Sequence, residues 1–525
     1  MSEQAAPVSD TVAEIIRGYT FEEPAIDLGV LLHDEQVVPD TPVPAARIRI
    51  PLAMLNRHGL VCGATGTGKT KTLQVMAEQI SAAGVPVFAA DIKGDLSGLA
   101  APGVPGEKLL ARTAAIGQEW QPQASPVEFL ALGGEGAGVP LRATVSSFGP
   151  ILLSKVMDLN EVQESTLGLV FHFADQSGLP LLDLADLRAV LQYLTSDEGK
   201  SELTNLGGVS KATVGVILRN LVTLETQGAG DFFGEPEFDT RDLMRTTTDG
   251  RGIISLLELP NLHDRPALFS TFLMWLLADL FSDLPEVGDA PKPKLVFFFD
   301  EAHLLFKDAS KAFLEAIAQT VRLIRSKGVG VFFVTQTPTD VPDEVLAQLG
   351  SRVQHQLRAH TPKDAKALRD TVQTFPISSY ELTEVLQGLG TGEAVVTVMD
   401  PDGAPTPVAP TRILAPQTLM DAIPPEALLP GIRASALMAR YGQAIDRDSA
   451  REMLGRKFEE GARRAEAEQA SRQQAPAPQQ TRQTRSRRPD PTIAEQVLKS
   501  SVFRQAARTA TREIVRSIFG VGRRR

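Results

Sequence analysis

The stretch from Val61 to Lys71 reads VCGATGTGKTK, and it decides the fold. Gly63 to Thr70 fit the pattern G-x-x-x-x-G-K-T at every fixed position. In such a loop the glycines let successive backbone N–H groups point at a phosphate, the lysine reaches the β- and γ-phosphates, and the threonine contacts Mg²⁺. We therefore predict a site for ATP and Mg²⁺ whose nucleotide-binding residues are Gly63, Ala64, Thr65, Gly66, Thr67, Gly68, Lys69, Thr70 and Lys71.

The residues on either side of this loop predict a β-α-β unit. The preceding HGLVCG is short and apolar, as expected of a strand, and KTLQVMAEQISAAG has apolar residues at helical spacing and a glycine where the helix would end. VPVFAAD then predicts a second buried strand that ends at Asp91. Two strands joined through a helix form a parallel pair, so we expect a mostly parallel α/β sheet.

The rest of the chain divides by composition and pattern. Strand and helix patterns alternate again after residue 250, with apolar runs such as KLVFFFD and VGVFFVTQ. We predict a short β-rich segment, the first part of the core, a largely helical insertion, the second part of the core, a charged helix with a flexible linker, and a basic amphipathic helix. Their expected ranges are 1–56, 57–100, 101–250, 251–450, 451–492 and 493–525.

A pair of carboxylates ends one of the predicted core strands. Asp300 follows LVFFF, so its carboxylate is placed to join Thr70 in holding Mg²⁺, and Glu301 comes next. We predict that Glu301 polarises the attacking water, because a glutamate at this point favours hydrolysis over transfer of the phosphoryl group to a metabolite. The alternative is an acidic turn with no catalytic role, which the loop upstream makes the weaker interpretation.

Other polar residues are candidates for the same site. Gln336 ends the strand after Glu301 and would face the same sheet edge, either sensing the γ-phosphate or only satisfying a strand end. Five arginines could stabilise transition-state charge in a neighbouring subunit, although each could equally be a solvated or salt-bridged surface residue. They are Arg57, Arg322, Arg325, Arg352 and Arg358.

Three more residues near the predicted site have simpler interpretations. Asp91 ends the second strand and either couples to the site or caps the following turn. Cys62 is the only cysteine, and we interpret it as a small buried residue that cannot form an internal disulfide. His303 is interpreted as structural, since the seven histidines show no metal-ligand spacing.

Composition favours a soluble, globular, cytoplasmic protein. Hydrophobic residues make up 43% and charged residues 22% of the 525 residues. No signal peptide is expected, and the longest apolar run, TFLMWLLADLF, is too short to span a membrane. The net charge is −11, yet residues 462–525 hold 15 basic and 5 acidic residues, so residues 1–461 carry −21. The basic end would dock on the protein itself, or bind nucleic acid or a membrane surface.

Taken together, these residues resemble the HerA/FtsK superfamily of P-loop motor ATPases, and within it the bacterial HerA-like group. The segments that carry the resemblance are NRHGLVCGATGTGKTKTLQVMAE, GVPVFAADIKGDLSGLA, PLRATVSSFGPILLSKVMDLNEVQE, KLVFFFDEAHLLF and VFFVTQTPTDVPDEVLAQLGSRVQHQLRA. The resemblance covers most of residues 20–450. It implies a RecA-like P-loop core with an inserted helical bundle and a C-terminal helical tail.

The resemblance also implies a hexameric ring with ATP between subunits, double-stranded DNA as the track and a nuclease partner. By position, the family motifs match Lys69, Thr70, Asp300, Glu301 and Gln336. The resemblance also makes Arg325 and Arg57 the better candidates for arginines at a subunit interface. Archaeal members begin with a full β-barrel, whereas about 55 residues precede the phosphate loop here. This difference puts the surface that docks a nuclease in doubt, and a partner would bind through the N-terminal segment or the basic tail.

Three functional hypotheses remain open from the sequence. The first is a ring-forming ATPase that translocates duplex DNA. The second is a regulatory or protein-remodelling ATPase whose track is not DNA, which the acidic body and the short N-terminal segment favour. The third is a conjugation or secretion motor, which the lack of a predicted membrane anchor weakens.

Overall fold

The computed structural model describes residues 10–34, 36–38, 46–133, 136–199, 201–202, 210–259, 266–288, 290–306, 309 and 311–474. The predicted amphipathic helix at 493–525 lies outside these residues, as does the linker after Gln474. The described chain forms two compact units. Of the described residues, the first unit comprises those within 10–144, 155–158 and 222–445, and the second comprises those within 145–154, 159–221 and 446–474.

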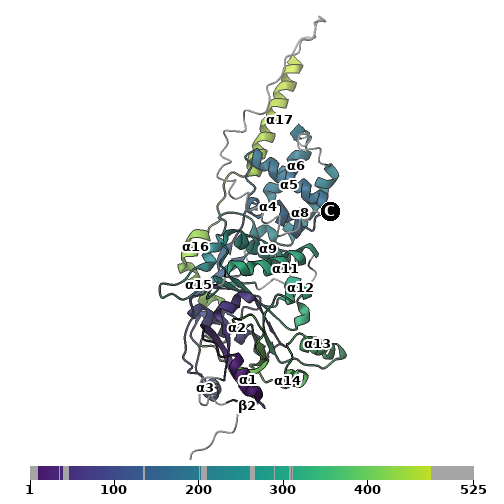
Figure 1. Ribbon diagram of the computed structural model, residues 1–525. Coiled ribbons are helices and arrows are strands. Elements are labelled where there is room, and N and C mark those ends of the chain that lie inside the picture. The colour runs from purple at the N-terminus through teal and green to yellow at the C-terminus, as the bar shows by residue number, and fades with distance from the viewer. Residues whose placement is uncertain are drawn as a thin grey trace, which may run out of the picture. The chain divides into compact units, whose positions relative to one another are not determined.

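The first unit is built on one mixed, mostly parallel sheet (Figure 1). Its order is β2-β1-β13-β12-β11-β4-β10-β9-β5-β8-β6-β7, and β3 also pairs with β1. The eight strands from β11 to β7 are parallel to their neighbours. The strands are β1 Ala25–His33, β2 Gln36–Val37, β3 Arg47–Pro51, β4 Gly59–Cys62, β5 Val87–Asp91, β6 Val127–Leu132, β7 Val139–Leu141, β8 Ile254–Glu258, β9 Leu295–Phe299, β10 Val329–Thr335, β11 Ser351–His355, β12 Glu393–Thr397 and β13 Ala409–Ile413.

The parallel part of the sheet forms because its strands are apolar along their whole length. Every residue of β9 and β10 is buried, as a parallel sheet covered on both faces requires. On one face, Phe298 packs in a core cluster with Leu73 and Met76 of α2, Lys69–Ala82. On the other face, the ring of Phe88 packs against Phe272 of α9, Pro266–Asp283.

The remaining helices of this unit connect or flank the strands. Among the described residues, no helix has both the length and the apolar character needed to cross a membrane. These helices are α1 Asp10–Gly18, α3 Glu107–Ala115, α10 His303–Phe306, α11 Lys311–Ile324, α12 Asp343–Leu346, α13 Pro362–Val372, α14 Leu382–Gly388, α15 Pro425–Ala434 and α16 Ala436–Tyr441.

The second unit is helical. It contains α5 Glu161–Gln176, α6 Leu184–Thr195, α17 Ala450–Gln474 and most of α4 Val145–Val156 and α8 Lys211–Thr226. α6 begins with a capping box in which Asp183 accepts from the N–H of Asp186. The backbone N–H groups at the start of α17 donate to Pro180 O and Asp186 Oδ1, which fixes this late helix beside α6.

The helical insertion is narrower than the range expected from the sequence. Residues 101–144 belong to the unit that holds the sheet, and β6 and β7 extend that sheet beyond β8. The glycine- and proline-rich loops around these two short strands hide them in the sequence pattern. The helical unit therefore begins at Val145.

Candidate nucleotide site

The phosphate loop lies between the end of β4 and the start of α2, as the motif predicts. Gly66 and Gly68 have φ values of 80° and 117°, which residues with a Cβ atom rarely adopt. A Cβ atom on Gly63 would lie 2.4 Å from Cβ of His355, so this position has no room for a side chain. The loop conformation thus depends on its glycines, and the first N–H groups of α2 are left for an anion.

His355, at the end of β11, packs against Gly63 of the phosphate loop. The sequence motifs do not identify this residue. It is fully buried, its Nδ1–H donates to Glu393 O at 2.8 Å, and Thr72 Oγ1 donates to its Nε2 at 2.9 Å. Burial lowers the pKa of His355 to about 4, so the ring is neutral and can accept at Nε2. Its position under Gly63 comes from the pairing of β11 with β4, which no local motif shows.

Lys69 lies along the inside of the phosphate loop. Its side chain is nearly buried, and Nζ donates to Gly63 O at 2.6 Å and to Ala64 O at 3.3 Å. Burial lowers the pKa of Lys69, while the neighbouring carboxylates Glu301 and Asp300 act in the opposite direction. The neighbouring Lys71 has its Nζ bonded to Met420 O instead, so only its backbone faces the predicted phosphate position.

Asp300 and Glu301 follow β9 at the same edge of the sheet. Only 6% of Asp300 and 5% of Glu301 is exposed, and the N–H of Glu301 donates to Asp300 Oδ1 at 2.8 Å. Burial raises the pKa of Asp300 to about 7. Glu301 has a φ of 45°, a left-handed conformation that is uncommon for a residue other than glycine and is often found at functional sites.

The structure adds Asp95 to the predicted metal ligands. Thr70 Oγ1 donates to Asp95 Oδ2 at 3.1 Å. Carboxylate oxygens of Asp91, Asp95 and Asp300 lie within 4.8 Å of one another. Oxygen ligands from a hydroxyl and carboxylates suit Mg²⁺, so these residues fit the ion that Thr70 and Asp300 are predicted to hold. Asp95 is in an irregular turn, where the sequence gives no metal-binding signal.

Asp91 acts as a cap, one of the two roles considered for it. Its Oδ1 accepts from the N–H groups of Lys93 and Gly94 at 3.1 and 2.8 Å, and its Oδ2 accepts from the N–H of Leu96 at 2.8 Å. Asp91 is fully buried, and burial raises its pKa to about 6. This carboxylate fixes the turn that carries both Lys93 and Asp95.

Glu301 contacts two basic side chains. Lys93 Nζ donates to Glu301 Oε1, and His303 Nδ1 lies 3.2 Å from Glu301 Oε2. Within the part of the chain that the structure describes, Glu301 Oε2 is buried and accepts no hydrogen bond. His303 therefore lies beside this carboxylate, which its interpretation as a structural residue does not include, and no sequence motif marks Lys93.

Gln336 reaches the predicted edge, because the residue before it, Thr335, pairs with Cys62 of β4. Its side chain is exposed. Cys62 itself is buried, and burial raises the pKa of its thiol well above the usual range, which fits its interpretation as a small buried residue. The proposed contact of Gln336 with a γ-phosphate or water stays a prediction.

Two of the candidate arginines, Arg57 and Arg325, precede their strands and so lie at the end of the sheet opposite to the phosphate loop. Arg57 ends the 3₁₀ turn Leu52–Arg57 before β4, and Arg325 opens the turn Arg325–Lys327 before β10. Both are close enough to buried His58 to help lower its pKa to about 4, after the larger effect of burial. Neither arginine therefore joins Lys69 within one subunit, and a role in a neighbouring subunit stays a prediction.

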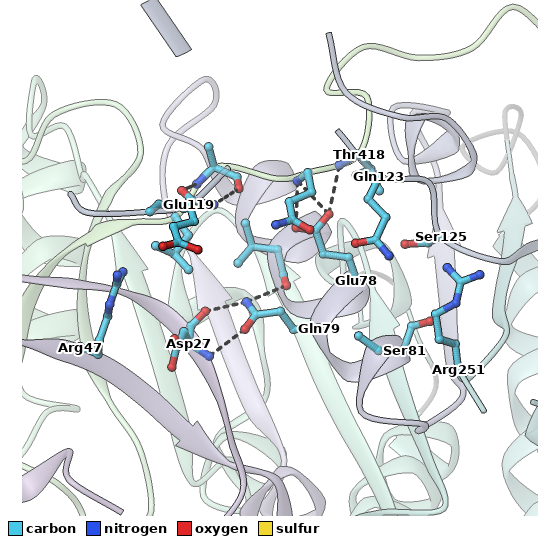
Figure 2. Close-up of a pocket in the computed structure, with 16 residues that line it drawn as sticks. Asp27, Arg47, Glu78, Gln79, Ser81, Glu119, Gln123, Ser125, Arg251 and Thr418 are labelled. Atoms are coloured by element: carbon cyan, nitrogen blue, oxygen red, sulfur yellow. Dashed lines mark hydrogen bonds between the residues drawn. The ribbon is translucent and has the colours of Figure 1, made fainter. Parts of the chain in front are cut away.

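A separate cavity of about 250 Å³ lies beside the C-terminal half of α2 (Figure 2). Glu78 points into it and accepts from the N–H of Gln417 at 3.0 Å and of Thr418 at 3.2 Å. Gln79 exchanges hydrogen bonds with the backbone of Asp27 across the same cavity. None of the phosphate-loop residues lines it, so it is distinct from the nucleotide site.

Comparison with known proteins gives one family. The family model described as "Helicase HerA-like C-terminal" matches residues 37–525. A search of curated proteins found no match. Among solved structures, the conjugative coupling protein TrwB, lacking its first 70 residues, is 14% identical with a TM-score of 0.49, over 78% of this chain and 94% of its own. VirB4 of Thermoanaerobacter pseudethanolicus is 13% identical with a TM-score of 0.47, over 76% of this chain and 98% of its own.

Proposed function

Because the chain belongs to the helicase HerA-like C-terminal family of P-loop ATPases, we propose that it is a ring-forming motor that hydrolyses ATP and moves double-stranded DNA. The observation that carries the hydrolytic part is the placement of Lys69, Thr70 and the Asp300–Glu301 pair at one sheet edge. This edge belongs to the RecA-like core. Membership of the family is the reason to expect a ring-shaped oligomer and DNA as the substrate that it moves.

Each side chain of the site has its own role in the proposed hydrolysis. Lys69 and the N–H groups at the start of α2 bind the β- and γ-phosphates of ATP. Thr70 and Asp300, joined by Asp95, would hold Mg²⁺, which neutralises charge that develops on the phosphate oxygens. Solved structures of TrwB with ADP and Mg²⁺ and with an ATP analogue support this choice of ligands.

Glu301 would orient the water that attacks the γ-phosphorus atom. The new P–O bond forms as the bond to the bridging oxygen breaks, and its electron pair leaves with ADP. The proton of the water passes to a Glu301 carboxylate oxygen. Oε2 is buried beside His303 Nδ1 at 3.2 Å but accepts no hydrogen bond from the described residues, so we assign that proton to it.

The alternative is a regulatory or protein-remodelling ATPase. The charge of −21 on residues 1–461 favours it, because an acidic body repels the phosphates of DNA unless a local basic channel is present. This alternative shares the hydrolytic site and differs only in what the motor acts on.

Steady-state ATP hydrolysis separates the two functions. The purified protein is assayed without DNA, with duplex DNA and with single strands, each at two salt concentrations, and Glu301→Gln gives the background rate. Several-fold stimulation by duplex that fades with added salt supports the DNA motor. A rate that DNA leaves unchanged under every condition contradicts it and supports the alternative.

A further inference from the structure

The turn after β5 brings a lysine to the carboxylate that would polarise water. Lys93 is two residues beyond Asp91, whose buried carboxylate accepts the backbone N–H of Lys93 itself and of two further residues in the turn. The backbone of Lys93 is therefore fixed by a group that lies outside the reacting atoms. The side chain extends from this fixed point to Glu301 Oε1.

Glu301 is buried among other carboxylates, and the basic side chains of Lys93 and His303 contact it. It is 5% exposed, follows Asp300 directly, and shares the sheet edge with Asp91 and Asp95. A cation that pairs with one member of a buried group of carboxylates offsets part of the repulsion among them and fixes the position of that carboxylate.

The two oxygens of Glu301 are in different surroundings. Oε1 accepts from Lys93 Nζ, whereas Oε2 is buried, has His303 Nδ1 3.2 Å away and accepts no hydrogen bond from the described residues. An ion pair on one oxygen fixes the rotation of the carboxylate and leaves the other oxygen to accept a proton. The side chain of Lys93 is 45% exposed, so it reaches the pair from the solvent side of the site.

We infer that Lys93 is a positioning residue for ATP hydrolysis: its ammonium group orients the carboxylate of Glu301 through Oε1 and does not bind the phosphates. This inference rests on the proposed function, in which Glu301 accepts the proton of the attacking water. Its role differs from that of Lys69, which lies in the phosphate loop and contacts that loop's own carbonyl groups.

The test compares Lys93→Met, Lys93→Arg and the control Lys292→Met in the full chain. Lys292 also donates hydrogen bonds, to Ala83 O and Gly84 O, but at the far end of α2. We expect Lys93→Met to lower kcat without DNA by roughly tenfold or more, since a positioned general base contributes about 10²–10⁴-fold. KM for ATP should change less than about twofold, because Lys93 does not contact ATP in this proposal and the binding of ground-state ATP stays the same. Lys93→Arg should recover most of kcat, and Lys292→Met should match the wild type.

Two further measurements distinguish the possible causes of a lower kcat in Lys93→Met. The affinity for a fluorescent ATP analogue is measured in the Glu301→Gln background, where Lys93→Met should leave it unchanged. The residual rate of Glu301→Gln should fall no further when Lys93→Met is added, because residues that act as a unit are not additive. Lys93→Gln replaces Lys93→Met if the latter does not fold.

Several results would overturn the inference. An unchanged or increased kcat in Lys93→Met would show that Lys93 is dispensable or restrains Glu301. A parallel loss of kcat and ATP affinity would make Lys93 a phosphate ligand. Wild-type hydrolysis by Glu301→Gln is a different failure, because it would remove the role proposed for Glu301 itself.

Discussion

At the scale of single residues, the site combines groups that a motif predicts with groups that it does not. The phosphate loop and the Asp300–Glu301 pair could be predicted because their geometry is local: eight consecutive residues form the loop, and two consecutive carboxylates end one strand. The roles of three other residues, Asp95, Lys93 and His355, could not be predicted from the sequence. Their contacts depend on the pairing of β5 with β9 and of β11 with β4, which no local pattern shows.

Replacing Lys69 by alanine should abolish nucleotide binding. Its ammonium group is the nearly buried cation that contacts the carbonyl groups of the phosphate loop, and no other side chain of that loop carries a charge in the same place. Binding of a fluorescent ATP analogue should fall below detection, with Lys292→Ala as the matched control. Normal ATPase activity in Lys69→Ala would rule out the assigned site.

Replacing Glu301 by glutamine should separate binding from hydrolysis. The amide keeps the size of the side chain but cannot accept the proton of water, so we expect kcat to fall by about 10²-fold or more. ATP should stay bound, which a filter assay with radiolabelled ATP would detect. Rapid turnover in this variant would mean that another group activates the water.

At the scale of elements, residues 417–420, which follow β13, are held along α2 by hydrogen bonds from side chains of that helix. Lys71, Gln74 and Glu78 of this helix bond to the backbone of Met420, Leu419 and residues 417–418 in turn. The same helix begins at the phosphate loop. A change in its position would therefore move this segment too.

Glu78 should make stability depend on pH. Burial raises its pKa from 4.5 to about 7, so the folded protein retains a proton that the unfolded chain has released. The stabilisation that protonated Glu78 contributes is fully present below about pH 4.5 and is lost as the pH rises through about 7. Between pH 5 and 8 the wild type should lose about 1–3 kcal/mol of unfolding free energy relative to Glu78→Gln.

Urea unfolding at the two pH values would measure this difference. Glu119→Gln is the matched control, because Glu119 is an exposed carboxyl group that lines the same cavity. Parallel pH profiles for the wild type and Glu78→Gln would show that this carboxyl group does not titrate in the expected range.

Element patterns predicted the parallel centre of the sheet better than its ends. Fully apolar runs such as β9 and β10 are recognisable because both faces are covered. The antiparallel end, where β1 pairs with β13, depends on residues almost four hundred positions apart, which no local pattern can indicate. At the other end, β7 has three residues and lies among loops.

At the scale of the whole molecule, the catalytic role predicted for the arginines requires a second subunit. Arg57 and Arg325 lie at the sheet edge opposite to Lys69, so they could reach a phosphate only in a neighbouring copy. Light scattering of Glu301→Gln with ATP should therefore give an oligomer, which we expect to be a hexamer. A strict monomer would leave these arginines without a catalytic role.

Mixing experiments would test the same arrangement. If Arg57 or Arg325 acts on a neighbour, Arg57→Ala or Arg325→Ala mixed with Lys69→Ala should regain part of the lost hydrolysis, since some interfaces then pair an intact loop with an intact arginine. Arg433→Ala, at an exposed position of α15, is the control. A mixture with no more activity than its components would argue against action between subunits.

The pairing of β1 with β13 has a consequence for how the protein is made. Gly29 leaves the ribosome long before Ile413, its partner in the sheet. At about 5–20 residues per second, the first strand waits roughly 20–80 s for this partner. During translation β1 has its local partners β2 and β3, so this early hairpin shields one of its edges while the other stays open to chaperones or to nascent chains on the same messenger RNA.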